Sequence, residues 1–197
     1  VALILLIVAL ARPQRQIGTE HHEQQGIAIQ MLIDVSSSMD FTVDYHGEQR
    51  TRMDIAKQVL QEFVVGNGGD LTGRPDDLVG IISFARYADT VCPLTLGHDA
   101  LAQIAEEITI NDRPNEDGTA YGDATALAAA RMKMLEETLT DGQGADDFQI
   151  KSKIIVLLTD GEDLEGRGLD LAYEAGRRGI HVYVVGMGSE AGGKIPD

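Results

Sequence analysis

Hydrophobic residues fall into short continuous runs that are separated by longer and more polar stretches. An apolar run of strand length is typical of a strand that is buried on both faces of a sheet. Such runs predict strands at residues 27–33, 78–84, 154–158 and 181–185. A shorter run at residues 90–94 predicts a further strand, and Pro93 within it favours an edge position because proline cannot donate a ladder hydrogen bond.

Several of the intervening stretches show helical spacing instead. From Arg52 onward apolar residues recur at helical intervals, and the glycine-rich run at 66–69 marks the end of this helix. Further helices are predicted at residues 100–108, from Ala124 through Leu135, and at residues 169–178. Asp99 is the expected N-cap of the first of these three. Polar stretches without a period predict loops at residues 40–51, 111–118 and 140–152.

Strands that alternate with helices indicate an α/β domain. We expect a doubly wound, mostly parallel sheet with one short antiparallel edge strand and with helices on both faces. In open sheets of this kind, ligands bind outside the carboxyl ends of the strands. Residues that follow a strand are therefore the first candidates for function.

Composition narrows the possible functions. The chain has 197 residues, enough for one domain with a sizeable core, and its formal net charge is −16. This acidity excludes a nucleic-acid binder, which needs basic residues to neutralise phosphates. Two explanations remain open for the carboxylates: they provide solubility, or some of them gather around a cation. Cys92 is the single cysteine, which excludes an intrachain disulfide and a cysteine-based zinc site.

The first eleven residues are apolar without a break, and no methionine precedes them. Ten residues of helix rise about 15 Å, half of a hydrocarbon core of about 30 Å. Because Arg12, Pro13 and Arg15 follow at once, we expect residues 1–11 to be the C-terminal part of a transmembrane helix. A buried first strand or helix is the alternative. Residues 12–25 are then a linker, and residues 26–197 form the domain.

Oxygen-rich turns follow two of the predicted strands. Asp34-Val35-Ser36-Ser37-Ser38 comes after the first strand, and Thr159-Asp160-Gly161 comes after the strand at 154–158. The side chains of residues 34, 36 and 38 can point toward one spot if the loop curls over the strand end. Asp160 would lie beside Asp34 if the two strands are neighbours. Thr119 precedes a helix, in a loop that can approach from the side.

These five side chains form a set of oxygen ligands: Asp34, Ser36, Ser38, Thr119 and Asp160. Three hydroxyls and two carboxylates suit a hard cation, either Mg²⁺ or Mn²⁺, with Ca²⁺ as a third candidate. If hydroxyls contact the ion directly and carboxylates act mostly through waters, the ion stays electrophilic and keeps one position open. An Asp or Glu carboxylate of a partner protein could fill that position. The alternative for the D-x-S-x-S segment alone is a helix N-cap.

The same segments resemble a known family. D-V-S-S-S, G-T at 118–119 and L-L-T-D-G at 157–161 resemble the metal-ion-dependent adhesion site of von Willebrand factor A domains, which are Rossmann-like. The segments I-I-S-F-A, P-L-T-L, E-D-G-T-A-Y-G-D-A and V-V-G-M-G-S-E-A-G-G-K-I-P-D resemble the bacterial aerotolerance (Bat) proteins, of the BatA and BatB kind. The loop at 140–152 is longer than the resemblance leads us to expect.

The resemblance carries its own expectations for the site. It implies direct metal contacts by Ser36, Ser38 and Thr119, and contacts largely through waters by Asp34 and Asp160. It also implies attachment to the bacterial inner membrane, association with MoxR-type AAA+ ATPases, and contact with other A-domain proteins. Arg12 and Arg15 are too few to say on which side of the membrane the domain lies.

The expected function is therefore a non-enzymatic, membrane-anchored interaction module that grips a partner carboxylate through its metal. The sequence has no G-x-S-x-G segment, no histidine near the two serines and no phosphate-binding P-loop, which disfavours hydrolase and ATPase activity. Two alternatives stay open. One is the integrin-like A domain of a metal-chelatase subunit that works with an AAA+ ATPase. The other is a metal-dependent hydrolase with Asp34 as nucleophile, although Ser36 replaces the second Asp of the D-x-D pattern.

Overall fold

The computed structural model describes residues 24–111, 118–140, 148–161 and 168–188. The predicted membrane segment at 1–11 lies outside the described residues, as does the linker up to residue 23. The last two residues assigned to the linker, Gln24 and Gln25, belong to the first strand.

Five strands form one sheet in the order β5-β4-β1-β6-β7. Neighbouring strands are parallel throughout, except that β5 runs antiparallel to β4. The strands are β1 (Gln24–Asp34), β4 (Leu78–Phe84), β5 (Ala88–Thr95), β6 (Phe148–Thr159) and β7 (Ile180–Gly186). The expected fold class is confirmed, including the antiparallel strand at Pro93 on an edge of this sheet.

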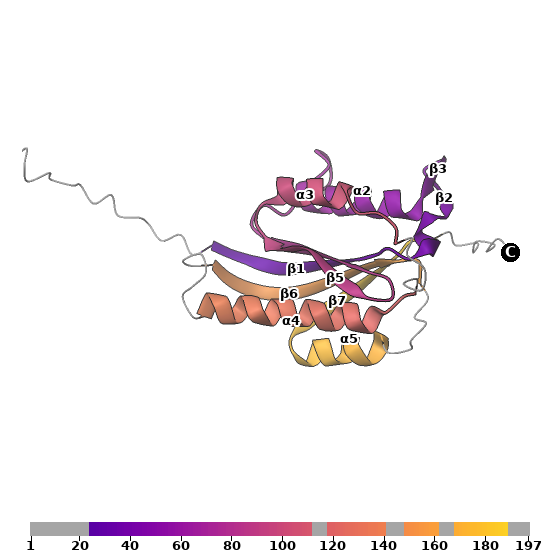
Figure 1. The fold of residues 1–197 in the computed structure, drawn as a ribbon. Coiled ribbons are helices and arrows are strands. Elements are labelled where there is room, and N and C mark those ends of the chain that lie inside the picture. Colours follow the sequence, from indigo (N-terminus) through magenta and orange to yellow (C-terminus); the bar gives the residue numbers. More distant parts are fainter. Residues whose placement is uncertain (1–23, 112–117, 141–147, 162–167, 189–197) are drawn as a thin grey trace, which may run out of the picture.

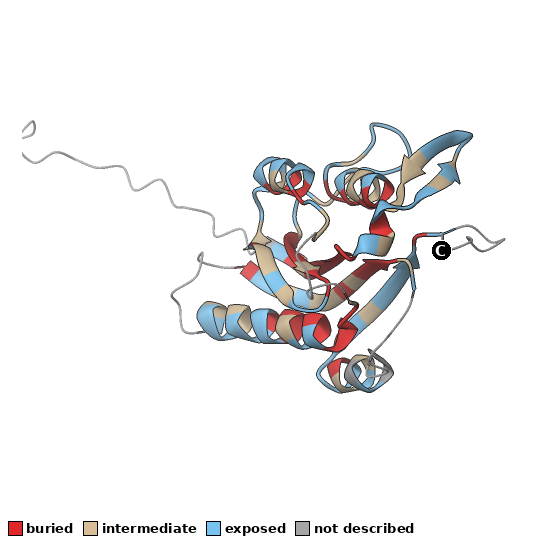
Figure 2. Cartoon of the chain, turned by 45° about the vertical axis from the view of Figure 1, so that its right-hand side comes forward, coloured by how far each residue is buried: buried red, intermediate tan, exposed pale blue. Residues whose placement is uncertain are grey.

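Helices cover both faces of the sheet. On one face lie α2 (Arg52–Val65) and α3 (His98–Glu106), and on the other lie α4 (Tyr121–Thr140) and α5 (Gly168–Arg177), as Figure 1 shows. Strand β1 supplies both cores by simple alternation. Ile29 and Met31 belong to the core under α2 and α3, whereas Leu32 belongs to the core under α4 and α5. The buried residues accordingly line the interior between sheet and helices (Figure 2).

The register of the parallel strands brings the two oxygen-rich turns to one edge. Asp34, the last residue of β1, pairs with Phe84, the last residue of β4. On the other side of β1, Ile33 pairs with Leu158 of β6, one residue before Thr159. Because parallel strands point the same way, the segments that follow β1, β4 and β6 emerge side by side. This is the carboxyl edge where a ligand was expected.

The prediction of a loop at residues 40–51 is wrong. The segment holds the end of a short 3₁₀ helix, η1 (Ser37–Asp40), followed by a hairpin of β2 (Thr42–Tyr45) and β3 (Glu48–Thr51). His46 and Gly47 both have positive φ, 54° and 87°, as a two-residue hairpin turn with the twist of the strands requires. Val43 and Tyr45 pack against the core, which stabilises an otherwise polar hairpin.

Two smaller expectations also fail. Strand β6 begins at Phe148, so residues 148–152 are strand rather than loop; Phe148 is buried and pairs with Gln24 of β1. Asp99 is not an N-cap, because α3 already begins at His98 and Gly97 occupies the cap position. The His98 ring, through Nε2, hydrogen-bonds the Asp77 carbonyl at 2.8 Å, which anchors the helix start.

No helix within the four described ranges is both long enough and apolar enough to cross a membrane.

Candidate metal centre

Asp34 ends β1 with a carboxylate that is completely buried. Its Oδ1 accepts a hydrogen bond from the Ser36 amide at 2.9 Å, and its Oδ2 accepts one from the Thr159 hydroxyl at 2.7 Å. Burial raises the pKa of Asp34; hydrogen bonds from Ser36 and Thr159 oppose this shift, and the negative charge of Asp160 adds to it. A buried carboxylate with neutral hydrogen-bond donors and a second carboxylate nearby is stabilised by an added cation.

Thr159 connects Asp34 to helix α4. Its hydroxyl proton goes to Asp34, so the Tyr121 hydroxyl donates to Thr159 Oγ1 at 2.9 Å. The Gly161 amide also reaches Thr159 Oγ1, at 3.3 Å. Sequence reasoning missed both Thr159 and Tyr121 as supporting residues. Thr159 directly precedes the predicted ligand Asp160, and Tyr121 lies two residues after the predicted ligand Thr119; this closeness in the chain was the available signal.

Ser36 and Ser38 present their hydroxyls to each other, with Oγ atoms 3.0 Å apart. Ser36 occupies the N-cap position of η1, yet its side chain makes no capping hydrogen bond. The alternative of a helix N-cap therefore accounts for the backbone conformation of Ser36, but it does not account for the position of the two hydroxyl groups. Their pairing next to Asp34 is the arrangement expected of two neighbouring oxygen ligands.

Thr119 is buried, and hydrogen bonds made by the two residues that follow it fix its position. The amide of the next residue, Ala120, donates to the Ala85 carbonyl just past the end of β4, at 2.8 Å. Tyr121 then reaches Thr159 at the end of β6. Because β1 lies between β4 and β6, these hydrogen bonds place Thr119 over the carboxyl edge where Asp34 ends.

Asp160 follows β6 and pairs with Arg52, the first residue of α2. Arg52 Nη1 lies 2.5 Å from Asp160 Oδ2 and donates to the Ser38 carbonyl at 3.1 Å. Both side chains are largely buried, with exposed fractions of 15% for Arg52 and 10% for Asp160. Sequence reasoning missed Arg52, because nothing in the local pattern around residue 52 points to a strand end more than a hundred residues away.

The donor set fits a hard divalent cation. Hydrogen bonds and the Arg52–Asp160 ion pair link Asp34, Ser36, Ser38 and Asp160, and backbone hydrogen bonding by Ala120 brings Thr119 to the same edge. Within the described ranges no group of three or more His, Cys, Asp and Glu side chains could hold a metal ion. The predicted donor set here combines hydroxyl oxygens with carboxylates, which suits Mg²⁺ and Mn²⁺.

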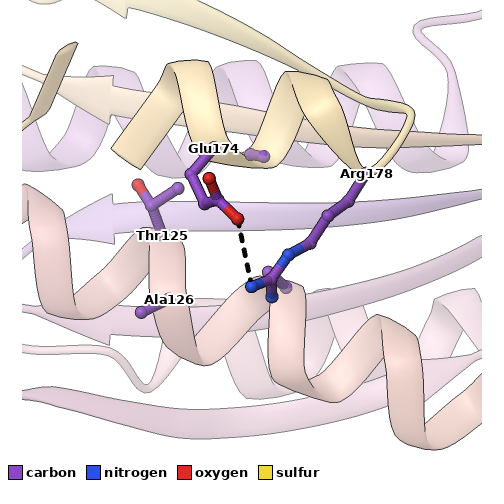
Figure 3. Close-up of a pocket in the computed structure, with 6 residues that line it drawn as sticks. Thr125, Ala126, Glu174 and Arg178 are labelled. Carbon is purple, nitrogen blue, oxygen red and sulfur yellow. Dashed lines mark hydrogen bonds and ion pairs between the residues drawn. The ribbon is translucent and has the colours of Figure 1, made fainter. Parts of the chain in front are cut away.

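A pocket lies between α4 and α5, and Figure 3 shows four of its lining residues labelled. Glu174 and Arg178 form an ion pair on the α5 side at 3.3 Å, and Thr125 and Ala126 line the α4 side. Its charges are thus satisfied within the pocket. None of the five predicted ligands lines it, so it does not compete as the site of metal chemistry.

Comparison with known proteins identifies related chains. Residues 29–162 match the model of the von Willebrand factor type A domain. An uncharacterized protein of Borreliella burgdorferi is 25% identical over 194 residues, which is 95% of this chain and 48% of that protein. The chain thus spans about half the length of the curated relative it matches.

Solved structures give the same assignment. BatB from Bacteroides thetaiotaomicron is 28% identical with a TM-score of 0.67, over 87% of this chain and 72% of that one. An aerotolerance-related membrane protein from Bacteroides fragilis is 29% identical with a TM-score of 0.66, over 87% and 73%. Proximal thread matrix protein 1 of the mussel byssus, solved with zinc in its MIDAS motif, shares the fold at 19% identity and a TM-score of 0.54, over 84% and 39%.

The family match includes the strand ends that carry Asp34 and Asp160 as well as the loop residue Thr119. The two Bacteroides structures, which are more than 25% identical to this chain, share its fold with TM-scores of 0.67 and 0.66. This chain therefore belongs to the von Willebrand factor type A domain family.

Proposed function

We propose that this domain is a non-enzymatic interaction module that binds a carboxylate of a partner protein through one divalent metal ion. The observation that carries the proposal is the fully buried Asp34 carboxylate beside the paired hydroxyls of Ser36 and Ser38. A buried negative charge next to aligned hydroxyls is costly to maintain unless a cation is bound there. The proposed ligands are Asp34, Ser36, Ser38, Thr119 and Asp160.

The hydroxyl and carboxylate ligands have different proposed roles. The hydroxyls of Ser36, Ser38 and Thr119 contact the ion, whereas Asp34 and Asp160 balance its charge largely through waters. Thr159 and the Ser36 amide hold both oxygens of Asp34 in place, so the carboxylate need not reorganise. The ion, when bound, supplies an electrophilic position that a partner Asp or Glu side chain completes.

Mg²⁺ and Mn²⁺ are the proposed ions, and Ca²⁺ is the third candidate, because all five ligands are oxygens. The zinc found in the mussel protein's MIDAS motif supports the general capacity of this fold to hold a divalent ion at such a motif. In this chain the absence of nitrogen and sulfur from the ligand set favours a harder ion than zinc.

Membrane attachment is the second part of the proposal. Residues 1–11 are apolar, and one related structure is that of an aerotolerance-related membrane protein. We propose that this segment anchors the domain to the bacterial inner membrane and that a MoxR-type AAA+ ATPase and other A-domain proteins are among its partners. The chelatase-subunit alternative shares the metal site and differs in the partner.

The hydrolase alternative is disfavoured by the surroundings of Asp34. A nucleophilic carboxylate needs an oxygen that is free to attack, but both oxygens of Asp34 accept hydrogen bonds and the side chain is fully buried. The same features suit a fixed charge beside a metal.

The test is a calorimetric titration of Mg²⁺ and of Mn²⁺ into the 197-residue chain in mild detergent. One saturable site is expected, and Ser36→Ala and Thr119→Ala should abolish it. Ser37→Ala is the matched control, because Ser37 lies in the same loop with an exposed side chain. Failure of the unmodified protein to bind either ion would contradict the proposal.

Carboxylate binding needs a second measurement. Acetate is added to the Mn²⁺-loaded protein while the relaxation of water protons is recorded. We expect relaxation enhancement to fall as acetate replaces a metal-bound water, whereas an equal concentration of chloride should leave it unchanged. If acetate does not lower the relaxation enhancement of the water protons, the proposal of carboxylate binding is contradicted.

A further inference from the structure

Arg52 occupies a position that helix formation does not explain. It is the first residue of α2, directly after Thr51, whose hydroxyl accepts the Asp54 amide and caps the helix. The N-terminus of a helix carries a partial positive charge, so an arginine there is unfavourable and an acidic residue is preferred. Yet the Arg52 side chain is only 15% exposed, which means that the fold directs it inward.

The β2–β3 hairpin places Arg52 at the metal centre. The hairpin closes with Thr42 opposite Thr51, and the Arg52 amide then donates to the Phe41 carbonyl at 3.1 Å. The guanidinium carbon lies 5.8 Å from the centre of the Phe41 ring. The chain leaves η1 just after Ser38, and the hairpin brings it back so that Arg52 lies next to Ser38.

One nitrogen of the guanidinium joins the two motif loops. Arg52 Nη1 pairs with Asp160 Oδ2 at 2.5 Å and donates to the Ser38 carbonyl at 3.1 Å. Its Nε is buried and has no hydrogen-bond partner among the described residues. The fold therefore leaves Nε without a hydrogen bond but keeps the guanidinium paired with Asp160. This ion pair lies in the same cluster as Asp34.

We propose that Arg52 is a built-in counter-cation of the centre: it neutralises Asp160 when no metal is present and thereby lowers the affinity for a divalent ion. The inference rests on the proposed function and names the residue that sets the strength of metal binding. A divalent ion beside Asp160 is repelled by the guanidinium and competes with it for the same carboxylate. The centre is then filled only where the ion is abundant or where a partner carboxylate adds its own charge.

The test measures metal affinity in charge variants of the 197-residue chain. Arg52→Gln removes the charge and should bind Mn²⁺ on the order of tenfold more tightly, which corresponds to about 1.4 kcal/mol. Arg52→Lys keeps the charge and should stay near the unmodified protein. Arg50→Gln is the matched control: Arg50 lies two residues away in β3 and bonds Gln58 of α2 rather than the centre, so its affinity should change by less than about twofold.

Thermal unfolding in EDTA supplies a second readout. Without metal, Arg52→Gln leaves Asp160 unneutralised, so its Tm should fall below that of Arg50→Gln. Saturating Mn²⁺ should then raise the Tm of Arg52→Gln by more than it raises that of the unmodified protein, because the metal replaces the lost charge. A loss of packing alone would lower both Tm values equally. Arg52→Met, whose stem can still pack on Phe41, is carried alongside in case the glutamine variant does not fold.

The outcomes separate the two proposals. Tighter binding by Arg52→Gln or Arg52→Met but not by Arg50→Gln supports the counter-cation role. Affinity that is unchanged or weaker in both Arg52 variants, with normal binding by the unmodified protein, overturns this inference and leaves the proposed function standing. Absence of a saturable site in every protein, including the unmodified one, overturns both.

Discussion

The hydroxyl of Thr159 donates to Oδ2 of Asp34 at 2.7 Å, across 125 residues of sequence. This single hydrogen bond joins the ends of β1 and β6, the two strands whose following turns hold predicted metal ligands. Because the Tyr121 hydroxyl donates in turn to Thr159, the start of α4 is tied to the same point. The contact therefore orients the carboxylate and holds three elements of the centre together.

Loss of the Thr159 hydroxyl should destabilise the whole domain. Thr159→Val leaves one oxygen of a buried carboxylate without its donor and Tyr121 without its acceptor, so the free energy of unfolding should fall by about 1–3 kcal/mol. Urea unfolding followed by circular dichroism measures the change. Thr90→Val is the control, because Thr90 accepts an exposed hydrogen bond from Arg131 and should cost less than about 0.5 kcal/mol. Equal losses in the two variants would refute the special role of Thr159.

Replacement of Asp34 should separate metal binding from stability. Asp34→Asn keeps the shape of the side chain and an oxygen that can accept the Ser36 amide, while its NH₂ group can donate to Thr159 Oγ1 if the Thr159 hydroxyl turns to donate to Tyr121. The substitution also removes a charge whose burial is unfavourable, as the raised pKa of Asp34 indicates. In EDTA this variant should be at least as stable as the unmodified protein, while its metal binding is lost. Chemical unfolding and calorimetric titration together test this; a metal-free protein weakened by more than about 1 kcal/mol would contradict it.

Truncation at the same position should behave differently. Asp34→Ala deprives both the Ser36 amide and the Thr159 hydroxyl of their acceptor in a buried site, so it should cost about 1–3 kcal/mol and still leave a folded protein. Far-ultraviolet circular dichroism should retain the α/β signal, with a midpoint of unfolding below that of Asp34→Asn. If Asp34→Ala proves as stable as Asp34→Asn, hydrogen bonding by the side chain at position 34 contributes nothing to the fold.

The hairpin turn should be sensitive to any side chain at Gly47. An added Cβ meets no atom within 4 Å, so space is not the constraint; the constraint is the backbone, with a φ of 87°. Gly47→Ala should therefore destabilise the protein by about 1 kcal/mol through backbone strain alone. Gly69→Ala is the control in another polar loop, because Gly69 itself does not have a positive φ and an added Cβ would lie 3.5 Å from its nearest atom. Comparable unfolding midpoints for the two variants would exclude strain at the turn.

The thiol of Cys92 should react slowly in the native protein. It is buried in β5, and this burial raises its pKa, so the reactive thiolate is scarce at neutral pH and reagents reach it only through local opening. Modification by a chromogenic disulfide reagent at pH 8 should be on the order of 100-fold slower in buffer than in 6 M guanidinium chloride. Rapid labelling of the folded protein would show that the β5 edge opens readily.

Much of this architecture was predictable from local pattern. Strand-length apolar runs identified the strands of the main sheet, and the period from Arg52 together with the glycine run at 66–69 bounded α2 correctly. The predicted ligands followed from the same logic, since oxygen-bearing residues directly after buried strands must emerge at the carboxyl edge of a parallel sheet. The hairpin at 42–51 escaped because its turn uses His46-Gly47 rather than the usual Asn-Gly, and because its strands are only four residues long.

The sequence by itself determined which residues could serve as ligands and on which edge of the sheet they would lie, because strand and helix periods depend on neighbours within a few positions. Only the tertiary structure decided what surrounds them. The order β4-β1-β6 sets Thr159 against Asp34, and the hairpin sets Arg52 against Asp160 and Ser38. Such partners lie many residues apart, and their meeting depends on strand order and on the packing of whole elements, which no local periodicity records.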